Sequence, residues 1–255
     1  MKVIAIIQAR VGSSRLPGKV LADLDGAPMI DRVIQRAGAA SRVSEVWVAS
    51  SDLPADDQLA DHCRAAGVPV ARGPERDVLA RFRLAAAMAE ADVVVRLTGD
   101  CPLLDPTVID RVIAEVTSQY PRIDYAANVL ERSFPRGLDT EAFTVAALER
   151  MDRLGQTPAS REHVTLGPRS EDPGAFTVRS VRAAGQDSDL RWTVDTAEDP
   201  AFVRDLYQAL GLGTGIRPYL EVVRWCREHR AGRHSDRRGT TWDPLQAPTL
   251  VTRGS

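Results

Sequence analysis

The sequence predicts one large α/β domain built on a mostly parallel β-sheet, and three observations support this. Short apolar runs rich in β-branched residues alternate with helical segments of about 10–15 residues, the pattern of βαβ units. The 255 residues are 44% hydrophobic and 27% charged, which is enough apolar material for a buried core. No apolar run approaches the ~18 residues of a membrane span.

The first elements follow one another from the N-terminus. Residues 3–7 form a continuous apolar run, typical of a strand buried in a parallel sheet. Residues 28–39 place Met29, Val33 and Ala37 on one face, which predicts a helix. Further strands are predicted at 45–50, 68–71 and 92–97, and further helices at 55–66, 77–90 and 106–119.

Helix boundaries are marked by residues with known end preferences. Gly67 follows the second helix where a left-handed glycine is expected, Asp77 can cap the third helix, and Asp105 is well placed to cap the helix beginning at Pro106. From about Tyr125 the alternation weakens. Strands are predicted at 176–181 and 190–193 and helices at 200–210 and 217–229. We therefore expect a single domain over 1–229, with a substrate or dimerisation subregion at about 125–185, and a tail over 230–255.

Charge and cysteine content exclude several protein classes. Lys and Arg number 33 against 35 Asp and Glu, a net charge of −2 that argues against a nucleic-acid coat or a polybasic membrane anchor. The three cysteines are far apart and suggest no disulfide framework. The N-terminus has no signal-peptide pattern. We expect a cytoplasmic protein that binds neither nucleic acid nor membranes.

The loop over residues 8–19 (QARVGSSRLPGK) leaves the carboxyl end of the first strand, where open α/β sheets bind their ligands. It combines glycines, the hydroxyls of Ser13 and Ser14, and the cations Arg10, Arg15 and Lys19, a mixture that suits a polyphosphate. Lys19 is one of only two lysines among the 33 basic residues, and an ammonium differs from a guanidinium in meeting a phosphate as a point charge.

Two familiar phosphate motifs do not describe this loop. Five residues, rather than four, separate Gly12 from Gly18-Lys19, so it is not a P-loop, and it is not GxGxxG. The alternative is a solvated basic loop, which Pro17 and Gly18 disfavour because they stiffen the chain.

Two aspartates follow predicted strands. Asp100 comes after the strand at 92–97 and Asp195 after the strand at 190–193, so parallel strands would bring both to one edge of the sheet. Carboxylates are ligands that Mg²⁺ prefers, and we expect the pair to share one ion. The alternative is that each aspartate caps a turn or helix.

A polar set lies in the irregular middle of the chain. It comprises PRGLDTE at 135–141, with Arg136, Asp139 and Glu141, and SREH at 160–163, with Arg161, Glu162 and His163. These residues either recognise a substrate or belong to the surface.

Together these segments resemble the cytidylyltransferase superfamily that includes CMP-3-deoxy-octulosonate and CMP-sialate synthetases, and most closely the spore-coat polysaccharide biosynthesis protein F branch. The likeness spans roughly residues 3–210 and rests on IIQARVGSSRLPGK, RGPERDVLARF, VRLTGDCPLLDP, PRGLDTEAF, REHVT and LRWTVDTAEDP. It implies a three-layer, Rossmann-like (GT-A-like) nucleotidyltransferase fold, Mg²⁺ as cofactor and a homodimer.

The resemblance also implies roles for individual residues. Lys19, Arg15 and Asp100 would be catalytic, and Asp100 and Asp195 would bind metal. Nucleotide contacts would come from Ala9, Arg10, Gly12, Ser13, Arg15, Lys19, Ser51, Gly73 and Asp77. Acceptor contacts would come from Arg136, Asp139, Glu141, Arg161, Glu162, His163 and Arg191. Arg76 departs from the pattern, since relatives of this branch often carry an acid there.

The implied reaction is transfer of CMP from CTP to an acidic sugar or related acceptor, with release of pyrophosphate. Two alternatives remain open at this point. One is a sugar-1-phosphate nucleotidylyltransferase that uses GTP or another nucleoside triphosphate, and the other is a non-catalytic nucleotide-binding protein.

Overall fold

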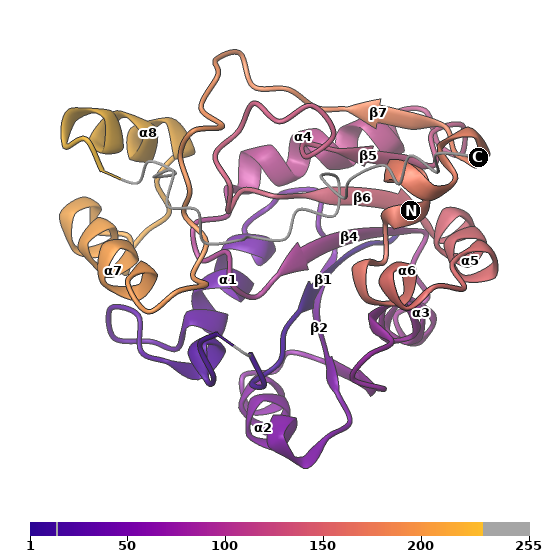
Figure 1. The fold of residues 1–255 in the computed structure, drawn as a ribbon, viewed down its shortest axis with the longest axis horizontal. Helices are drawn as coiled ribbons and strands as arrows, with labels where there is room; N and C mark the ends of the chain where they lie inside the picture. The colour runs from indigo at the N-terminus through magenta and orange to yellow at the C-terminus, as the bar shows by residue number, and fades with distance from the viewer. Residues whose placement is uncertain (14, 232–255) are drawn as a thin grey trace, which may run out of the picture.

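The computed structural model describes residues 1–13 and 15–231, and these form a seven-stranded sheet with helices on both faces (Figure 1). The strand order is β3-β2-β1-β4-β6-β5-β7. Their bounds are Val3–Gln8 (β1), Glu45–Ser51 (β2), Val70–Gly73 (β3), Val93–Thr98 (β4), Tyr125–Ala127 (β5), Glu141–Thr144 (β6) and Val178–Ser180 (β7). Among these described strands β6 alone pairs antiparallel with its neighbours, which confirms the mostly parallel α/β prediction.

The helices make two layers, one on each face of the sheet (Figure 1). Successive residues of a strand point to opposite faces, and β1 shows this directly: Ala5 and Ile7 join one apolar cluster, whereas Ile4 and Ile6 join another. The first cluster includes side chains of α1, α2, α4, α7 and α8, and the second those of α3 and α5. The helices span Met29–Gly38 (α1), Asp57–Ala65 (α2), Val78–Met88 (α3), Pro106–Thr117 (α4), Val145–Leu154 (α5), Pro158–His163 (α6), Asp199–Leu210 (α7) and Tyr219–Glu228 (α8).

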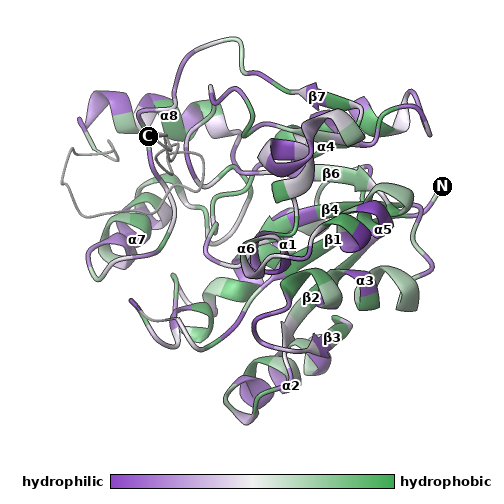
Figure 2. Ribbon diagram, turned by 45° about the vertical axis from the view of Figure 1, so that its right-hand side comes forward, coloured by the Kyte–Doolittle hydropathy of each residue, from purple (hydrophilic) through white to green (hydrophobic). Residues whose placement is uncertain are grey.

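Hydropathy follows these layers. In Figure 2 the central strands are mostly green, while the helices carry green and purple on different sides. The predicted helix ends are confirmed: the Asp77 carboxylate accepts from Ala80 N, Asp105 accepts from Thr107 N and Val108 N, and Gly67 has a φ of 76°.

The second half of the chain differs from its prediction. The strand predicted at 190–193 is wrong, because this segment forms isolated β-bridges rather than a strand of the sheet, and among the described residues one such bridge joins Arg191 to Arg136. The strand predicted at 176–181 shortens to β7, and β5, β6, α5 and α6 were not predicted. Short strands of three or four residues carry too little periodicity to be seen in a sequence.

The weak periodicity of residues 125–185 suggests a segment unsuited to closing the core of a monomer, which favours a dimer, but in the structure these residues do contribute to the core. Tyr125, Phe143 and Leu148 are fully buried and pack in the second apolar cluster, the one with α3 and α5. The need to close an incomplete core is therefore no argument for a homodimer. The predicted tail lies outside the described residues from position 232 onward.

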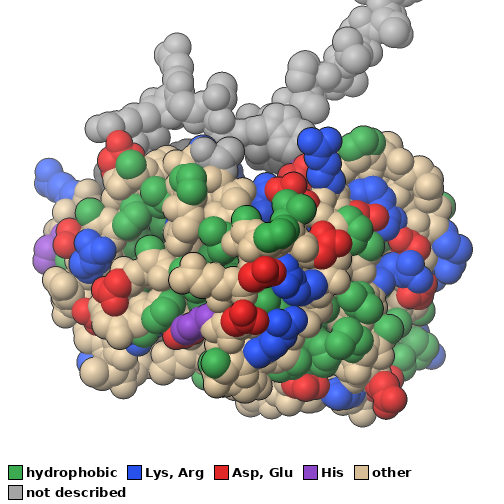
Figure 3. All heavy atoms as spheres, turned by 90° about the horizontal axis from the view of Figure 1, so that it is seen from below, with side chains coloured by type: hydrophobic (Ala, Val, Ile, Leu, Met, Phe, Trp, Pro, Cys, Tyr) green, Lys and Arg blue, Asp and Glu red, His purple; other side chains and the backbone are tan. Residues whose placement is uncertain are grey.

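Charges of both signs are mixed on the surface. On the face in Figure 3, Lys and Arg side chains lie among Asp and Glu side chains. Arg83, for example, bonds to both Glu149 and Asp152. In the described part of the chain, none of the helices combines the length and apolarity needed to cross a bilayer.

Candidate functional site

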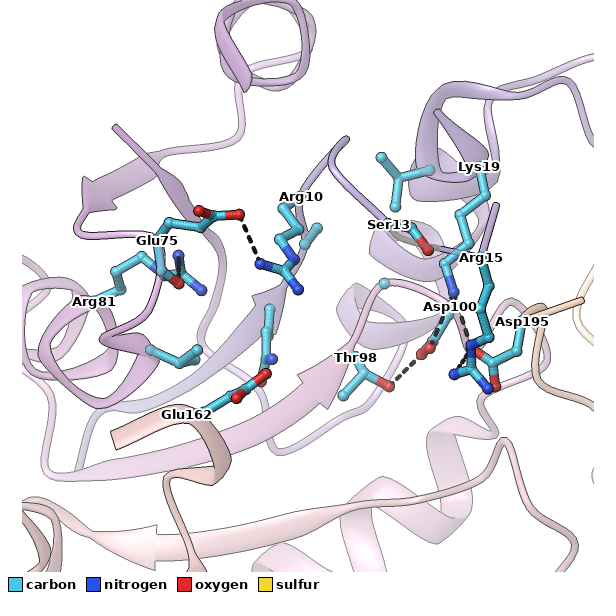
Figure 4. Close-up of a pocket in the computed structure, with 15 residues that line it drawn as sticks. Arg10, Ser13, Arg15, Lys19, Glu75, Arg81, Thr98, Asp100, Glu162 and Asp195 are labelled. Carbon is cyan, nitrogen blue, oxygen red and sulfur yellow. Dashed lines mark hydrogen bonds and ion pairs between the residues drawn. The ribbon is translucent and has the colours of Figure 1, made fainter. Parts of the chain in front are cut away.

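A polar pocket of about 230 Å³ opens at the carboxyl ends of β1 and β4 (Figure 4). These strands are parallel neighbours whose last residues, Gln8 and Thr98, lie directly opposite each other. The loops that follow them therefore start side by side, one carrying residues 9–18 and the other Gly99 and Asp100. The pocket is lined by Gln8, Ala9, Arg10, Ser13, Arg15, Lys19, Val20, Glu75, Val78, Arg81, Thr98, Gly99, Asp100, Glu162 and Asp195.

Gly99 allows these two loops to approach closely. A Cβ at this position would lie 2.9 Å from the Ala9 Cβ, which is too short for two carbon atoms. Gly99 N also donates to Gln8 O at 2.9 Å. The glycine thus places Asp100 beside the loop that carries Lys19.

Lys19 joins the two predicted metal-binding aspartates (Figure 4). Its Nζ donates to Asp195 Oδ1 at 3.0 Å, to Asp100 Oδ2 at 3.4 Å and to Val194 O at 2.6 Å. Both carboxylate oxygens therefore lie within 3.4 Å of one nitrogen. The distance between the two carboxylate oxygens is therefore shorter than ~8 Å, the separation above which neither one ion nor two neighbouring ions could link them.

The contacts that place Asp195 here differ from the predicted ones. Instead of ending a sheet strand, its segment is tied by Val194 N donating to Asp100 O at 2.9 Å and Trp192 N donating to Arg136 O at 2.7 Å. Gly137 permits this contact: its φ is 105°, and a Cβ there would lie 3.0 Å from the Trp192 carbonyl carbon.

Positive charges surround the Asp195 carboxylate. Lys19 and Arg15 approach Oδ1 at 3.0 and 3.5 Å, and Arg191 approaches Oδ2 at 3.2 Å. Burial alone would raise the pKa of Asp195, but these cations outweigh burial and hold the pKa below its ordinary value. Asp195 therefore faces the pocket as a carboxylate.

Charged groups of both signs meet at the other end of the pocket (Figure 4). Arg10 Nη1 donates to Glu75 Oε1 at 2.9 Å. Arg81 is 2% exposed and donates to the carbonyls of Pro74 and Glu75, which fixes the turn before α3. Glu162 reaches the pocket from α6.

Several residues predicted to contact nucleotide do not line the pocket. Ser51 is fully buried, and its hydroxyl donates to Asp56, whose other oxygen accepts from Val11 N. Asp77 caps α3 and makes a bidentate pair with Arg161. Gly12, in the loop after β1, and Gly73, the last residue of β3, are outside the lining set.

Most of the predicted acceptor residues bond to other protein groups. Asp139 pairs with Arg132, Arg191 with Asp199, and Arg161 with Asp77 and Asp152. Of the predicted acceptor set, Glu162 lines the pocket.

Glu141 and His163, which also belong to the predicted acceptor set, have pKa values shifted by their surroundings. Glu141 is 3% exposed and bonds to Arg96, Tyr125 and Thr165. Burial alone would raise the pKa of Glu141, but Arg96 and the nearby Arg169 hold it below its ordinary value. Burial lowers the pKa of the partly buried His163.

The pocket contains residues that sequence reasoning missed. Gln8 and Thr98 are polar residues at strand ends, a signal that was present in the sequence. Arg81 and Glu75 lie in the segment RGPERDVLARF, but which of its many charged side chains faces the pocket depends on the start of α3.

The sequence model of one family, cytidylyltransferase, matches residues 4–196. The spore coat polysaccharide biosynthesis protein SpsF of Bacillus subtilis is 35% identical over 216 residues, which cover 82% of this chain and 88% of that protein. The 3-deoxy-manno-octulosonate cytidylyltransferase of Geobacter metallireducens is 41% identical over 120 residues, 46% of each chain. A cytidylyltransferase structure from Leptospira borgpetersenii superposes with a TM-score of 0.86 at 29% identity, covering 95% of this chain and 100% of that one.

Proposed function

The chain belongs to the cytidylyltransferase family, and we propose that it transfers CMP from CTP to an acidic sugar or a related acceptor, releasing pyrophosphate. In this reaction an acceptor oxygen bonds to the α-phosphorus of CTP. The bond between that phosphorus and the oxygen bridging to the β-phosphate breaks, and pyrophosphate leaves with the electron pair.

One observation carries the proposal: three cations of the loop after β1 and two aspartates from other segments line the same pocket at the carboxyl ends of β1 and β4. Arg10, Arg15 and Lys19 come from the loop after β1. Asp100 and Asp195 come from two distant segments and meet at Lys19. A polyphosphate needs the cations, and a divalent ion that accompanies it needs the carboxylates.

The donor set fits Mg²⁺ in the presence of a nucleotide. Asp100 and Asp195 offer hard carboxylate oxygens a few ångströms apart, the ligand type that Mg²⁺ prefers. The described residues contain no cluster of three or more His, Cys, Asp or Glu suited to a metal. Phosphate oxygens and water would have to complete the coordination, as is usual for this ion. When bound, Mg²⁺ would neutralise charge developing on the phosphates.

The side chains of the protein supply positioning and charge. Arg15 and Lys19 hold the leaving pyrophosphate, because they are cations on the loop that faces the two aspartates. Because the three ammonium protons of Lys19 already have protein acceptors, Lys19 must release one of these contacts to donate to phosphate. Little covalent work is left for the protein in phosphoryl transfer, so alignment of the attacking and leaving oxygens provides the rate enhancement.

The acceptor would meet the residues that are not committed elsewhere. Arg136 follows Pro135 in the PRGLD segment, and its buried Nε has no hydrogen-bond partner among the described residues. A planar guanidinium suits a carboxylate or phosphate. Glu162, which lines the pocket whereas Arg136 does not, suits sugar hydroxyls as a hydrogen-bond acceptor.

A thermal-shift screen of CTP, GTP, UTP, ATP and dTTP, each with Mg²⁺, tests the choice of base. A ligand at ~100 times its Kd adds ~2.7 kcal/mol to stability. We expect CTP to raise the melting temperature most. A clear preference for GTP or another triphosphate would overturn CTP as the donor.

Pyrophosphate release over many turnovers tests catalysis. With CTP, Mg²⁺ and a panel of sugar acids, we expect release together with a CMP-sugar product detected by mass spectrometry. Pyrophosphate release only with sugar 1-phosphates would instead indicate a sugar-1-phosphate nucleotidylyltransferase. Nucleotide binding with no turnover on any acceptor of either class would favour a binding protein.

Family resemblance leads us to propose a homodimer as well. Sedimentation at micromolar concentration should then give about twice the 27.8 kDa of one chain. A single species near 27.8 kDa would contradict the proposal.

A further inference from the structure

The carboxylate of Asp199 lies directly behind Asp195, at the first residue of α7. Its Oδ2 accepts from the backbone N–H groups of Asp195 and Thr196, both at 2.7 Å. The turn that joins the Asp195 segment to α7 is therefore held by the side chain of Asp199. Asp195 itself caps no part of this turn in the described contacts, so its carboxylate is left to face the pocket.

Arg191 links the same two acids from the other side. Its Nη1 and Nη2 donate to Asp199 Oδ1 and Oδ2 at 2.8 and 2.9 Å, and Nη2 also donates to Asp195 Oδ2 at 3.2 Å. The side chains of Arg191 and Asp199 are 16% and 13% exposed. A bidentate pair that is mostly shielded from water has a defined geometry as well as a favourable energy.

These contacts leave Asp199 away from the reacting groups. Asp199 and Arg191 do not line the pocket, whereas Asp195 does. The Asp195 carboxylate is thus held by Arg191 on one oxygen and by Lys19 and Arg15 on the other. Asp199 thus contacts the same Arg191 guanidinium that donates to Asp195.

We propose that Asp199 is a positioning residue, which sets the place of the Asp195 carboxylate at the pocket through Arg191 and two backbone N–H groups. This positioning role depends on the proposed function only for the activity measurement below, and not for the hydrogen-exchange measurement. Groups that orient a metal-binding or catalytic residue without touching the substrate commonly change affinity or activity by 10–100-fold when removed.

Amide hydrogen exchange tests the positioning without any substrate. In Asp199→Ala the amides of Asp195 and Thr196 should exchange at least about tenfold faster, because each loses its hydrogen-bond acceptor. Asp205→Asn is the matched control, since Asp205 is an exposed acid of the same helix. Unchanged protection at both amides in Asp199→Ala would overturn the proposal.

Turnover with CTP and Mg²⁺ provides the second readout. Asp199→Asn should lower kcat about 10- to 100-fold and change KM for CTP far less, while its melting temperature stays close to that of Asp205→Asn. In an Asp195→Asn background, Asp199→Asn should lower kcat little further, because Asp199 acts through Asp195. Equal losses in both backgrounds would overturn the proposal. If the wild type does not turn over CTP, the proposed function fails, and the exchange rates alone decide the role of Asp199.

Discussion

Lys19 Nζ lies 3.0 Å from Asp195 Oδ1, although 176 positions separate the two residues in the chain. The same nitrogen lies 3.4 Å from Asp100 Oδ2. Three segments thus meet at one ammonium group: the loop after β1, the end of β4 and the extended stretch before α7. The site depends on this convergence, and the predictions below test it from different sides.

Lys19→Ala should weaken the binding of CTP and reduce turnover while the fold stays intact. Each lost contact between a charged group and phosphate is worth about 1.5–3 kcal/mol, or about 10- to 150-fold in affinity. Isothermal titration with CTP measures this loss. Lys2→Ala is the matched control, because the only other lysine pairs with Glu45 away from the pocket. Equal affinity of Lys19→Ala and wild type would contradict the role of Lys19.

Gly137→Ala should lower the free energy of unfolding by about 1–3 kcal/mol. The residue has a φ of 105°, and a Cβ would press on the backbone of Trp192 at 3.0 Å. Urea denaturation measures the change. Gly174→Ala is the control, because no atom lies within 4 Å of the added carbon there. Similar stabilities for the two variants would show that the Trp192 segment is not held in this way.

Arg161→Ala and Asp77→Ala should each lower stability by about 1–3 kcal/mol. The pair is bidentate, at 2.9 and 2.7 Å, and joins α6 to the start of α3. A double-mutant cycle followed by urea denaturation should show strong coupling between the two changes. Additive effects would mean that the pair does not join these helices, and would return Arg161 to the candidates for acceptor binding.

Glu141 should make stability depend on pH in the acidic range. Its pKa in the folded protein lies below its ordinary value, mainly because Arg96 and Arg169 outweigh the effect of burial. Its contribution is therefore present above the unfolded pKa of about 4.3 and is lost as the pH falls from there toward the folded pKa.

Melting curves of the wild type and Glu141→Gln from pH 7 to pH 3 measure this effect. The wild type should be more stable at pH 7, by up to about 3 kcal/mol, and the difference should shrink below about pH 4.3. A difference that stays constant or grows toward low pH would contradict the prediction.

The parallel half of the fold could be predicted because its signals are local. An apolar run such as 3–7 and end signals such as Gly67 and Asp77 need no knowledge of distant residues. The loop with Lys19 and the strand-end position of Asp100 were accessible for the same reason. In the second half the helices α7 and α8 were predicted, but β5 and β6 could not be, since they are short and are defined by pairing with each other and with β4.

The partners of charged side chains were the least predictable feature of the site. Arg161 and Arg191 look like free cations in the sequence, yet each meets aspartates that the fold brings near. Asp199, which holds the turn after Asp195, is one of many acids in the sequence and is distinguished only by its contacts.

The most direct test is a double-mutant cycle on Asp100 and Asp195. Electron paramagnetic resonance measures the binding of Mn²⁺ in the presence of CTP, and turnover is measured for the same variants. Asn keeps the size of each side chain but removes the charge that holds the ion. We expect Asp100→Asn and Asp195→Asn each to reduce turnover by about 100-fold or more and to weaken Mn²⁺ binding, with the fold intact. Two ligands of one ion act as a unit, so the double variant should be hardly worse than the worse single one. Losses that simply multiply, or Mn²⁺ affinity unchanged in either single variant, would contradict a shared ion.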